Sequence, residues 1–123
     1  MKVPGESPFL KMQIDSDEGK ATAVLPIEQV HRNPYGIVHG GVYASLADNV
    51  MGAAVASSMP DDRHFHTVDL HVRYARSISE GTLHASGKVV KPGRRLVMAD
   101  CEITDESGRL LATATASFFV VEQ

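Results

Sequence analysis

The sequence predicts an α+β fold in which one buried helix packs against a curled antiparallel sheet. Three observations lead to this prediction. Apolar and polar residues alternate through most of the second half of the chain, tight turns separate these stretches, and one segment replaces the alternation with a helical period. The chain has 123 residues, the length of one ordinary domain, so we expect a single domain over residues 1–123.

The first elements expected are a short hairpin and the helix. Residues 9–14 and 21–25 are apolar stretches separated by the polar turn 15–19. Further on, apolar residues recur every four positions in two neighbouring rows that begin at Val42 and Tyr43. Gly40 and Gly41 precede these rows. Because the rows make the helix apolar around most of its circumference, we expect protein to surround it on most sides.

Four strands should follow the helix. Residues 68–74, 83–89, 97–103 and 110–121 alternate or are rich in β-branched and aromatic residues. Turn residues at 91–94 and 105–108 separate the last three of these stretches. Strands joined by such short turns pair antiparallel, which predicts a mostly antiparallel sheet.

Composition excludes several functional classes. Twelve Lys and Arg stand against fifteen Asp and Glu, a formal net charge of −3, so no overall positive field attracts nucleic acid. The single cysteine, Cys101, has no partner for an internal disulfide, which favours a reducing compartment. The first residues lack the apolar run of a signal peptide, and Asp48 interrupts the most apolar stretch. We therefore expect a cytoplasmic protein that binds neither nucleic acid nor membrane.

The segment from Asn33 to Gly41, followed by Asp48, carries the most chemical information. Two glycines at a helix N-terminus expose backbone N–H groups, and the helix dipole makes these groups attractive to an oxyanion. His39, directly before them, can orient the loop or donate a hydrogen bond. A carboxylate in a nearly apolar helix is costly unless it is partnered or functional. Pairing with a buried polar group or an arginine is the structural alternative for Asp48.

The spacing of these groups constrains how they can cooperate. Asp48 follows Gly40 by eight residues, which separates them by about 12 Å along one helix. A base or nucleophile and an oxyanion donor must both lie about 3 Å from the same carbonyl group. If the two groups act together, a second protomer must supply one of them, most simply in a two-fold dimer with antiparallel helices.

The helix-start motif resembles that of a known family. Asn33, the run from His39 to Gly41, the run from Leu46 to Asn49 and the strand from Thr67 to Leu70 are together similar to the hotdog-fold acyl-CoA thioesterases, in particular the phenylacetate-degradation branch. The similarity extends over residues 10–121. It implies a long central helix wrapped by a curved antiparallel sheet of five to six strands. It also implies a homodimer, with dimers commonly pairing into homotetramers.

The resemblance implies a role for each motif residue. The Gly40 N–H would polarise the thioester carbonyl, and His39 and Asn33 would support the loop that holds it. Asp48, from the other protomer, would act as general base or nucleophile. Thr67 falls where relatives often place a serine or threonine that could position water.

Substrate contacts are also implied. Gly41 would lie against the substrate beside Gly40. Because relatives bind the CoA nucleotide with surface basic residues, Lys91, Arg94 and Arg95 are the candidates for that contact. We expect no cofactor and no metal. His64 and His66 invite a metal interpretation, but no further ligand at suitable spacing completes a site.

Two other functions stay open at this stage. The same fold supports hydration or dehydration of an acyl thioester, and it also serves as a non-catalytic acyl-CoA binding module. The acyl group is not identified either, because the aromatic and sulfur-containing side chains that could line its pocket, Tyr43, Met51 and Phe65, could equally belong to the core.

Overall fold

The computed structural model describes residues 10–121, which form six strands and one long helix. A single 3₁₀ turn, Gln29–His31, lies between the second strand and the helix. In chain order the elements are β1 (Gln13–Asp17), β2 (Lys20–Pro26), α1 (Gly40–Ser57), β3 (His64–Tyr74), β4 (Thr82–Lys91), β5 (Leu96–Thr104) and β6 (Leu110–Val121).

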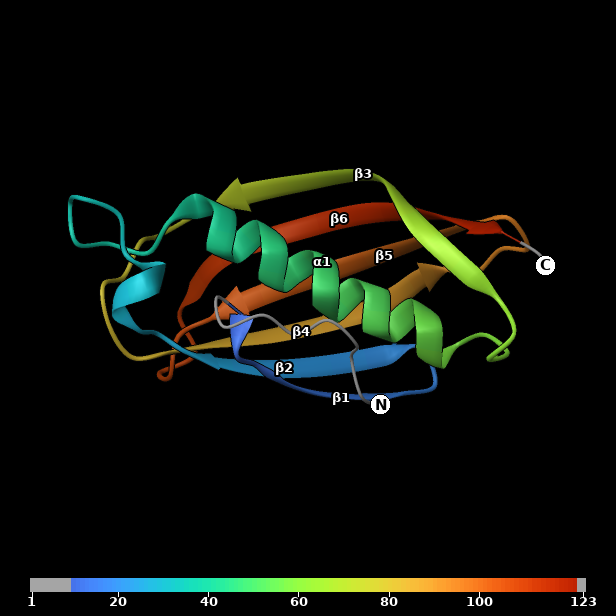
Figure 1. Cartoon of the computed structure of the whole chain (residues 1–123), viewed down its shortest axis with the longest axis horizontal. Coiled ribbons are helices and arrows are strands. Elements are labelled where there is room, and N and C mark those ends of the chain that lie inside the picture. The colour runs from blue at the N-terminus through green and yellow to red at the C-terminus, as the bar shows by residue number, and fades with distance from the viewer. Residues whose placement is uncertain (1–9, 122–123) are drawn as a thin grey trace.

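The strands form one antiparallel sheet in the order β1-β2-β4-β5-β6-β3. The sheet curls around α1, which lies lengthwise across its inner face (Figure 1). The predicted fold class, one helix on a curved antiparallel sheet, is therefore confirmed. Neither α1 nor the 3₁₀ turn combines the length and hydropathy of a transmembrane helix, within the described residues.

The core lies between α1 and the inner face of the sheet. Nine residues of α1 are buried, as the two predicted apolar rows require. Helix and sheet approach each other closely at Gly87, where an added Cβ would lie 2.9 Å from Val50 Cγ1. Real Cβ atoms do not approach so closely, so glycine at this position lets the middle of α1 settle onto β4.

Strand β3 departs from the predicted alternation. It begins at His64, four residues before the predicted start, and contains a bulge between Thr67 and Asp69. The bulge inserts Val68 as an extra residue without a partner on β6 and changes which side chains face inward. Val68 is therefore 54% exposed, although simple alternation from residue 68 predicts it to be buried.

The N-terminal hairpin also differs in its boundaries. Strand β1 is Gln13–Asp17, so it includes residues that the sequence assigns to the turn. Glu18 and Gly19 make the turn instead, both with positive φ, a conformation that glycine adopts without strain. Of the predicted first strand, residue 9 lies outside the described residues.

The turn between β5 and β6 is held by one carboxylate. Asp105 Oδ1 accepts hydrogen bonds from the backbone N–H of Ser107 and Arg109, both at 2.9 Å, and Oδ2 pairs with Arg109 Nε at 2.8 Å. The Arg109 backbone N–H is the main donor that holds the pKa of Asp105 well below its usual range.

This depressed pKa makes a prediction about acid stability. Because the folded chain favours the carboxylate, Asp105 contributes stability above its unfolded pKa of about 4, and this contribution is lost as the pH falls below that value. Asp105→Ala should therefore lower the melting temperature at pH 7, and the difference from wild type should shrink toward pH 3. Thermal unfolding followed by circular dichroism across this range tests it; a difference that is the same at both pH values would contradict it.

Candidate active site

A carboxylate and a hydroxyl meet where α1 crosses β3. Asp48 lies on the half-buried side of α1, and Thr67 Oγ1 donates a hydrogen bond of 2.8 Å to Asp48 Oδ1. Thr67 is the last residue of β3 before the bulge. The hydrogen bonds of residues 10–121 leave Asp48 Oδ2 without a donor, so this oxygen is open to water or a substrate. A carboxylate oriented through one oxygen and open at the other can act as base or nucleophile.

The N-terminus of α1 carries two open donors. His39 is the N-cap, and its side chain makes no capping hydrogen bond. The Val42 N–H donates to the His39 carbonyl, whereas in the described part of the chain no acceptor lies at the N–H of Gly40 or Gly41. With the dipole of an 18-residue helix behind them, these two N–H groups form an electropositive terminus suited to a developing negative charge.

Asn33 shapes the loop that leads into the helix. Its Oδ1 accepts hydrogen bonds from the backbone N–H of Tyr35, at 2.9 Å, and of Ile37, at 3.3 Å. Its own N–H donates to the Ile37 carbonyl, and its carbonyl accepts from Gly36. The side chain therefore folds residues 33–37 into a compact turn.

His31 holds the same loop through hydrogen bonds of its side chain and its carbonyl, a feature that the sequence reasoning did not identify. The side chain is fully buried, and its Nδ1 accepts a 2.8 Å hydrogen bond from the Glu28 N–H. The His31 carbonyl accepts the His39 N–H at 2.9 Å. His39 thus joins the loop through its backbone, while its imidazole is exposed.

Tyr74 is the second residue of the site that the sequence reasoning did not identify. It counted only as an apolar position of the predicted strand 68–74. Its hydroxyl donates a 2.8 Å hydrogen bond to the Gly40 carbonyl. A tyrosine at the end of a strand carries a phenol that needs a polar partner, which is the one sequence signal that could have drawn attention to it. Strand β3 therefore contacts both parts of the site, the acid through Thr67 and the helix start through Tyr74.

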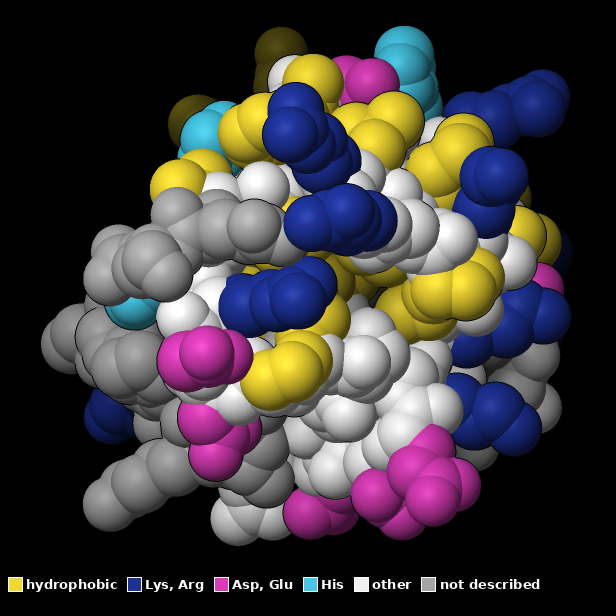
Figure 2. All heavy atoms as spheres, turned by 90° about the vertical axis from the view of Figure 1, so that its right-hand side faces the viewer, with side chains coloured by type: hydrophobic (Ala, Val, Ile, Leu, Met, Phe, Trp, Pro, Cys, Tyr) yellow, Lys and Arg dark blue, Asp and Glu magenta, His cyan; other side chains and the backbone are white. Residues whose placement is uncertain are grey.

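Lys91, Arg94 and Arg95 lie at the opposite end of α1 from Gly40. Gly19 lies next to Ser58, the C-cap of α1, and its carbonyl accepts a hydrogen bond from the N–H of Val89. This contact places the end of β4 beside the C-terminal end of α1. Figure 2 views this end of the molecule: Lys and Arg side chains gather over its upper and central part, and Asp and Glu side chains lie mainly along the lower part and the lower left. The side chains of Lys91, Arg94 and Arg95 are exposed.

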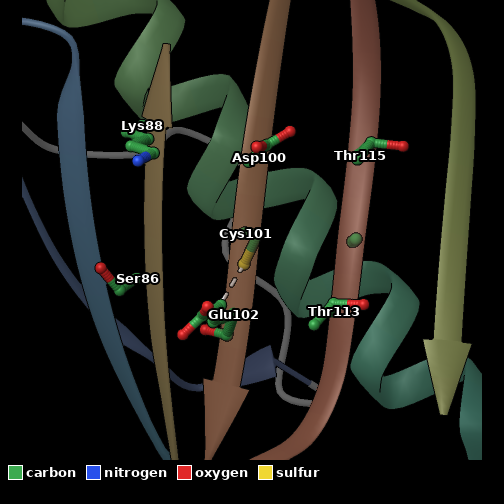
Figure 3. Close-up of a pocket in the computed structure, with 8 residues that line it drawn as sticks. Ser86, Lys88, Asp100, Cys101, Glu102, Thr113 and Thr115 are labelled. Atoms are coloured by element: carbon green, nitrogen blue, oxygen red, sulfur yellow. Dashed lines mark hydrogen bonds between the residues drawn. The ribbon is translucent and has the colours of Figure 1, made fainter. Parts of the chain in front are cut away.

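A shallow hollow of about 370 Å³ lies on the outer face of the sheet, away from α1 (Figure 3). Its lining comes from β4, β5 and β6 and consists of Ser86, Lys88, Asp100, Cys101, Glu102, Thr113, Ala114 and Thr115. The sheet separates this hollow from Asp48 and Gly40. Burial raises the pKa of the Cys101 thiol to about 12, so the thiol is not a nucleophile at neutral pH.

Of the three side chains considered for an acyl pocket, two belong to the core. Tyr43 is 2% exposed and Met51 is fully buried. Phe65 is half-buried, and its ring lies 3.7 Å from the position of a Cβ at Gly52, one helical turn after Asp48. Within residues 10–121 no group of three acidic, histidine or cysteine side chains is arranged to hold a metal ion.

Comparison with known proteins gives a consistent picture. The profile of the Thioesterase superfamily matches residues 35–112. The 1,4-dihydroxy-2-naphthoyl-CoA hydrolase of Listeria monocytogenes is 24% identical over 107 residues, which cover 87% of each chain. The conserved protein PA5202 of Pseudomonas aeruginosa is 28% identical and superposes with a TM-score of 0.91 over 97% of this chain and 95% of that one.

A second solved structure is similar as well. It is a hypothetical thioesterase of Streptococcus pneumoniae with coenzyme A, 26% identical, with a TM-score of 0.85 over 92% of this chain and 88% of that one. The match to the family profile includes the helix start, Asp48 and Thr67, whereas Asn33 and His31 lie just before the matched residues.

Proposed function

Because this chain belongs to the Thioesterase superfamily, has the hotdog fold and is a thioester hydrolase, we propose that it hydrolyses an acyl-CoA thioester to the free acid and CoA. The observation that carries the proposal is the Asp48–Thr67 pair on the half-buried side of a helix whose N-terminal N–H groups are open. The CoA thioester is supported by the Listeria relative, a naphthoyl-CoA hydrolase, and by the similar streptococcal structure with coenzyme A.

The proposed chemistry uses the two parts of the site in different roles. Asp48 either takes a proton from water, whose oxygen then attacks the thioester carbonyl, or attacks that carbon itself to form an anhydride that water hydrolyses. In both routes the carbonyl oxygen becomes negatively charged and the CoA thiolate leaves. The Gly40 N–H, aided by the helix dipole, stabilises this oxyanion. Thr67 holds Asp48 and places water beside it, while Asn33 and His39 keep the Gly40 loop in place.

The site requires two copies of the chain. Gly40 and Asp48 belong to one continuous helix, about 12 Å apart along its axis, so one protomer cannot bring both to the same carbonyl carbon. In the proposed homodimer, Asp48 of one protomer faces Gly40 of the partner subunit, and the two-fold axis creates two identical sites.

Two surfaces of the fold support this dimer. Strand β3 is eleven residues long and stands at the end of the strand order, so one edge has no partner strand within the described sheet. Such an edge is normally covered. Beside it, the half-buried side of α1 carries small or short residues that allow close approach of a second helix: Ala44, Ser45, Asp48, Asn49, Gly52 and Ala56.

The contacts within one chain also support one pairing register for the proposed dimer. Thr67 lies at Asp48, and Tyr74 lies at Gly40. An axis that joins Asp48 to Gly40 of the partner subunit therefore places Thr67 beside Tyr74 of the partner subunit. The two β3 edges then pair antiparallel about a point between Leu70 and His71, which is halfway from Thr67 to Tyr74. Pairing of two such dimers into a homotetramer is a further expectation, which sedimentation analysis tests.

The basic turn, defined as Lys91, Arg94 and Arg95, would bind the CoA nucleotide. Asp48 precedes the end of α1 at Ser57 by nine residues, or about 14 Å along the axis. The basic turn lies at that end, so an extended pantetheine arm could run from the thioester beside Asp48 to phosphates at the turn. Gly41 would line the path of the substrate at the helix start of the partner subunit.

One prediction of the proposed function concerns Asp48. Asp48→Asn keeps the size of the side chain and removes the base or nucleophile, so kcat for acyl-CoA hydrolysis should fall about 10²- to 10⁴-fold with the melting temperature nearly unchanged. Asp100→Asn, the same substitution on the outer face of the sheet, is the control and should retain full activity. Release of free thiol from a panel of aryl-, short- and long-chain acyl-CoAs gives the readout; near-normal turnover by Asp48→Asn would rule out the proposal.

Another prediction of the proposed function concerns the basic turn. Alanine at Arg94 and Arg95 together should raise KM for an acyl-CoA about tenfold and leave kcat within twofold, because exposed charges would bind the nucleotide in ground state and transition state alike. The matched substrate is the same acyl group on N-acetylcysteamine, which has no nucleotide. Wild type and variant should hydrolyse it equally well, and an equal loss on both substrates would show that the turn does not bind the nucleotide.

A further inference from the structure

The hydroxyl of Tyr74 acts on the peptide group at the start of α1. It donates to the Gly40 carbonyl at 2.8 Å, and this carbonyl belongs to the peptide that carries the Gly41 N–H. The ring is held from behind by Tyr43, with centroids 5.8 Å apart and planes at 80°. Tyr43 itself is buried, and burial raises the pKa of its phenol. Tyr74 therefore packs edge to face against a buried aromatic ring.

The same ring limits the position of Gly40. A Cβ at residue 40 would lie 3.2 Å from Tyr74 Oη and 3.3 Å from Cζ, closer than most real contacts. At residue 41 a Cβ would have no heavy atom within 4 Å. The first turn of α1 is thus covered by Tyr74 on one side and open on the other. The N–H groups of Gly40 and Gly41 have no acceptor among the described residues.

The hydrogen bond from the Tyr74 hydroxyl to the Gly40 carbonyl also makes a backbone N–H group a stronger donor. A carbonyl oxygen has two lone pairs, so the Gly40 oxygen can accept both the helical bond and the Tyr74 hydroxyl. A hydrogen bond at the oxygen of a peptide polarises the whole unit and makes its N–H a better donor. The N–H so strengthened is that of Gly41, which lies at the electropositive end of the helix.

We infer that Tyr74 is a positioning residue for thioester hydrolysis: its hydroxyl fixes the first turn of α1 and strengthens the Gly41 N–H as a second donor to the oxyanion, beside that of Gly40. The inference rests on the proposed function, because these donors assist catalysis only if the thioester carbonyl lies against them. In the proposed dimer Tyr74 of one protomer adjoins Thr67 of the partner subunit, so both positioning hydroxyls lie at the same site.

Tyr74→Phe tests the role of the hydroxyl. This substitution keeps the ring against Tyr43 and removes only the O–H. The expected result is a kcat about tenfold lower, with KM within twofold and a melting temperature within a few degrees of wild type. Thr115→Val is the control for the loss of a hydroxyl, since Thr115 is exposed on the outer face of the sheet, away from α1, and it should leave both kinetic constants unchanged.

Tyr74→Leu separates the hydroxyl from the ring. If Tyr74→Phe retains the wild-type kcat and only Tyr74→Leu loses activity, the ring matters and the inference about the hydroxyl is wrong. A Tyr74→Phe protein whose kcat, KM and melting temperature all worsen together would show a purely structural role and would also overturn it. Asp48→Asn in the same assay keeps the proposed function separable, because its loss of turnover does not depend on Tyr74.

Discussion

The distance between Gly40 and Asp48 along α1, set by the rise per residue of an α-helix, limits how these two groups can cooperate. Gly40 begins α1 and Asp48 lies near its middle, so the open N–H groups and the carboxylate face different positions about 12 Å apart. No change of rotamer brings them together within one chain. Because of this separation, a hydrolytic site that uses both groups must form between two copies of the chain. The surfaces near these groups must then be able to join.

The sheet makes that arrangement possible by holding both ends of the site on one strand. Strand β3 touches Asp48 through Thr67 and the helix start through Tyr74, each by a 2.8 Å hydrogen bond. Because β3 also lies at one edge of the described sheet, pairing it with its copy would bring the two contacts to each other. The close approach at Gly87 fixes the helix on the opposite side, so α1 and β3 keep their relative positions.

Periodicity and turn chemistry were enough to predict the helix, the antiparallel sheet and the order of the elements. The predicted alternation was wrong where the backbone is irregular. The bulge at Val68 inserts an unpaired residue, and no alternation pattern reveals where such an insertion occurs. Tyr74 and His31 were missed for a different reason. Their partners, the carbonyl of Gly40 and the backbone N–H of Glu28, are backbone groups whose positions depend on the folded chain.

Complementation between two inactive variants tests the shared site most directly. Gly40→Pro removes the N–H at the first helical position, where proline is favoured, and His39 already has the extended conformation that precedes proline. Gly40→Ala, which keeps the N–H, controls for the contact of the added Cβ with Tyr74. When Gly40→Pro and Asp48→Asn are unfolded, mixed equally and refolded, half of the dimers should be mixed and half of their sites intact, restoring about a quarter of wild-type activity. Activity no greater than the sum of the two separate variants would contradict a site built from both protomers.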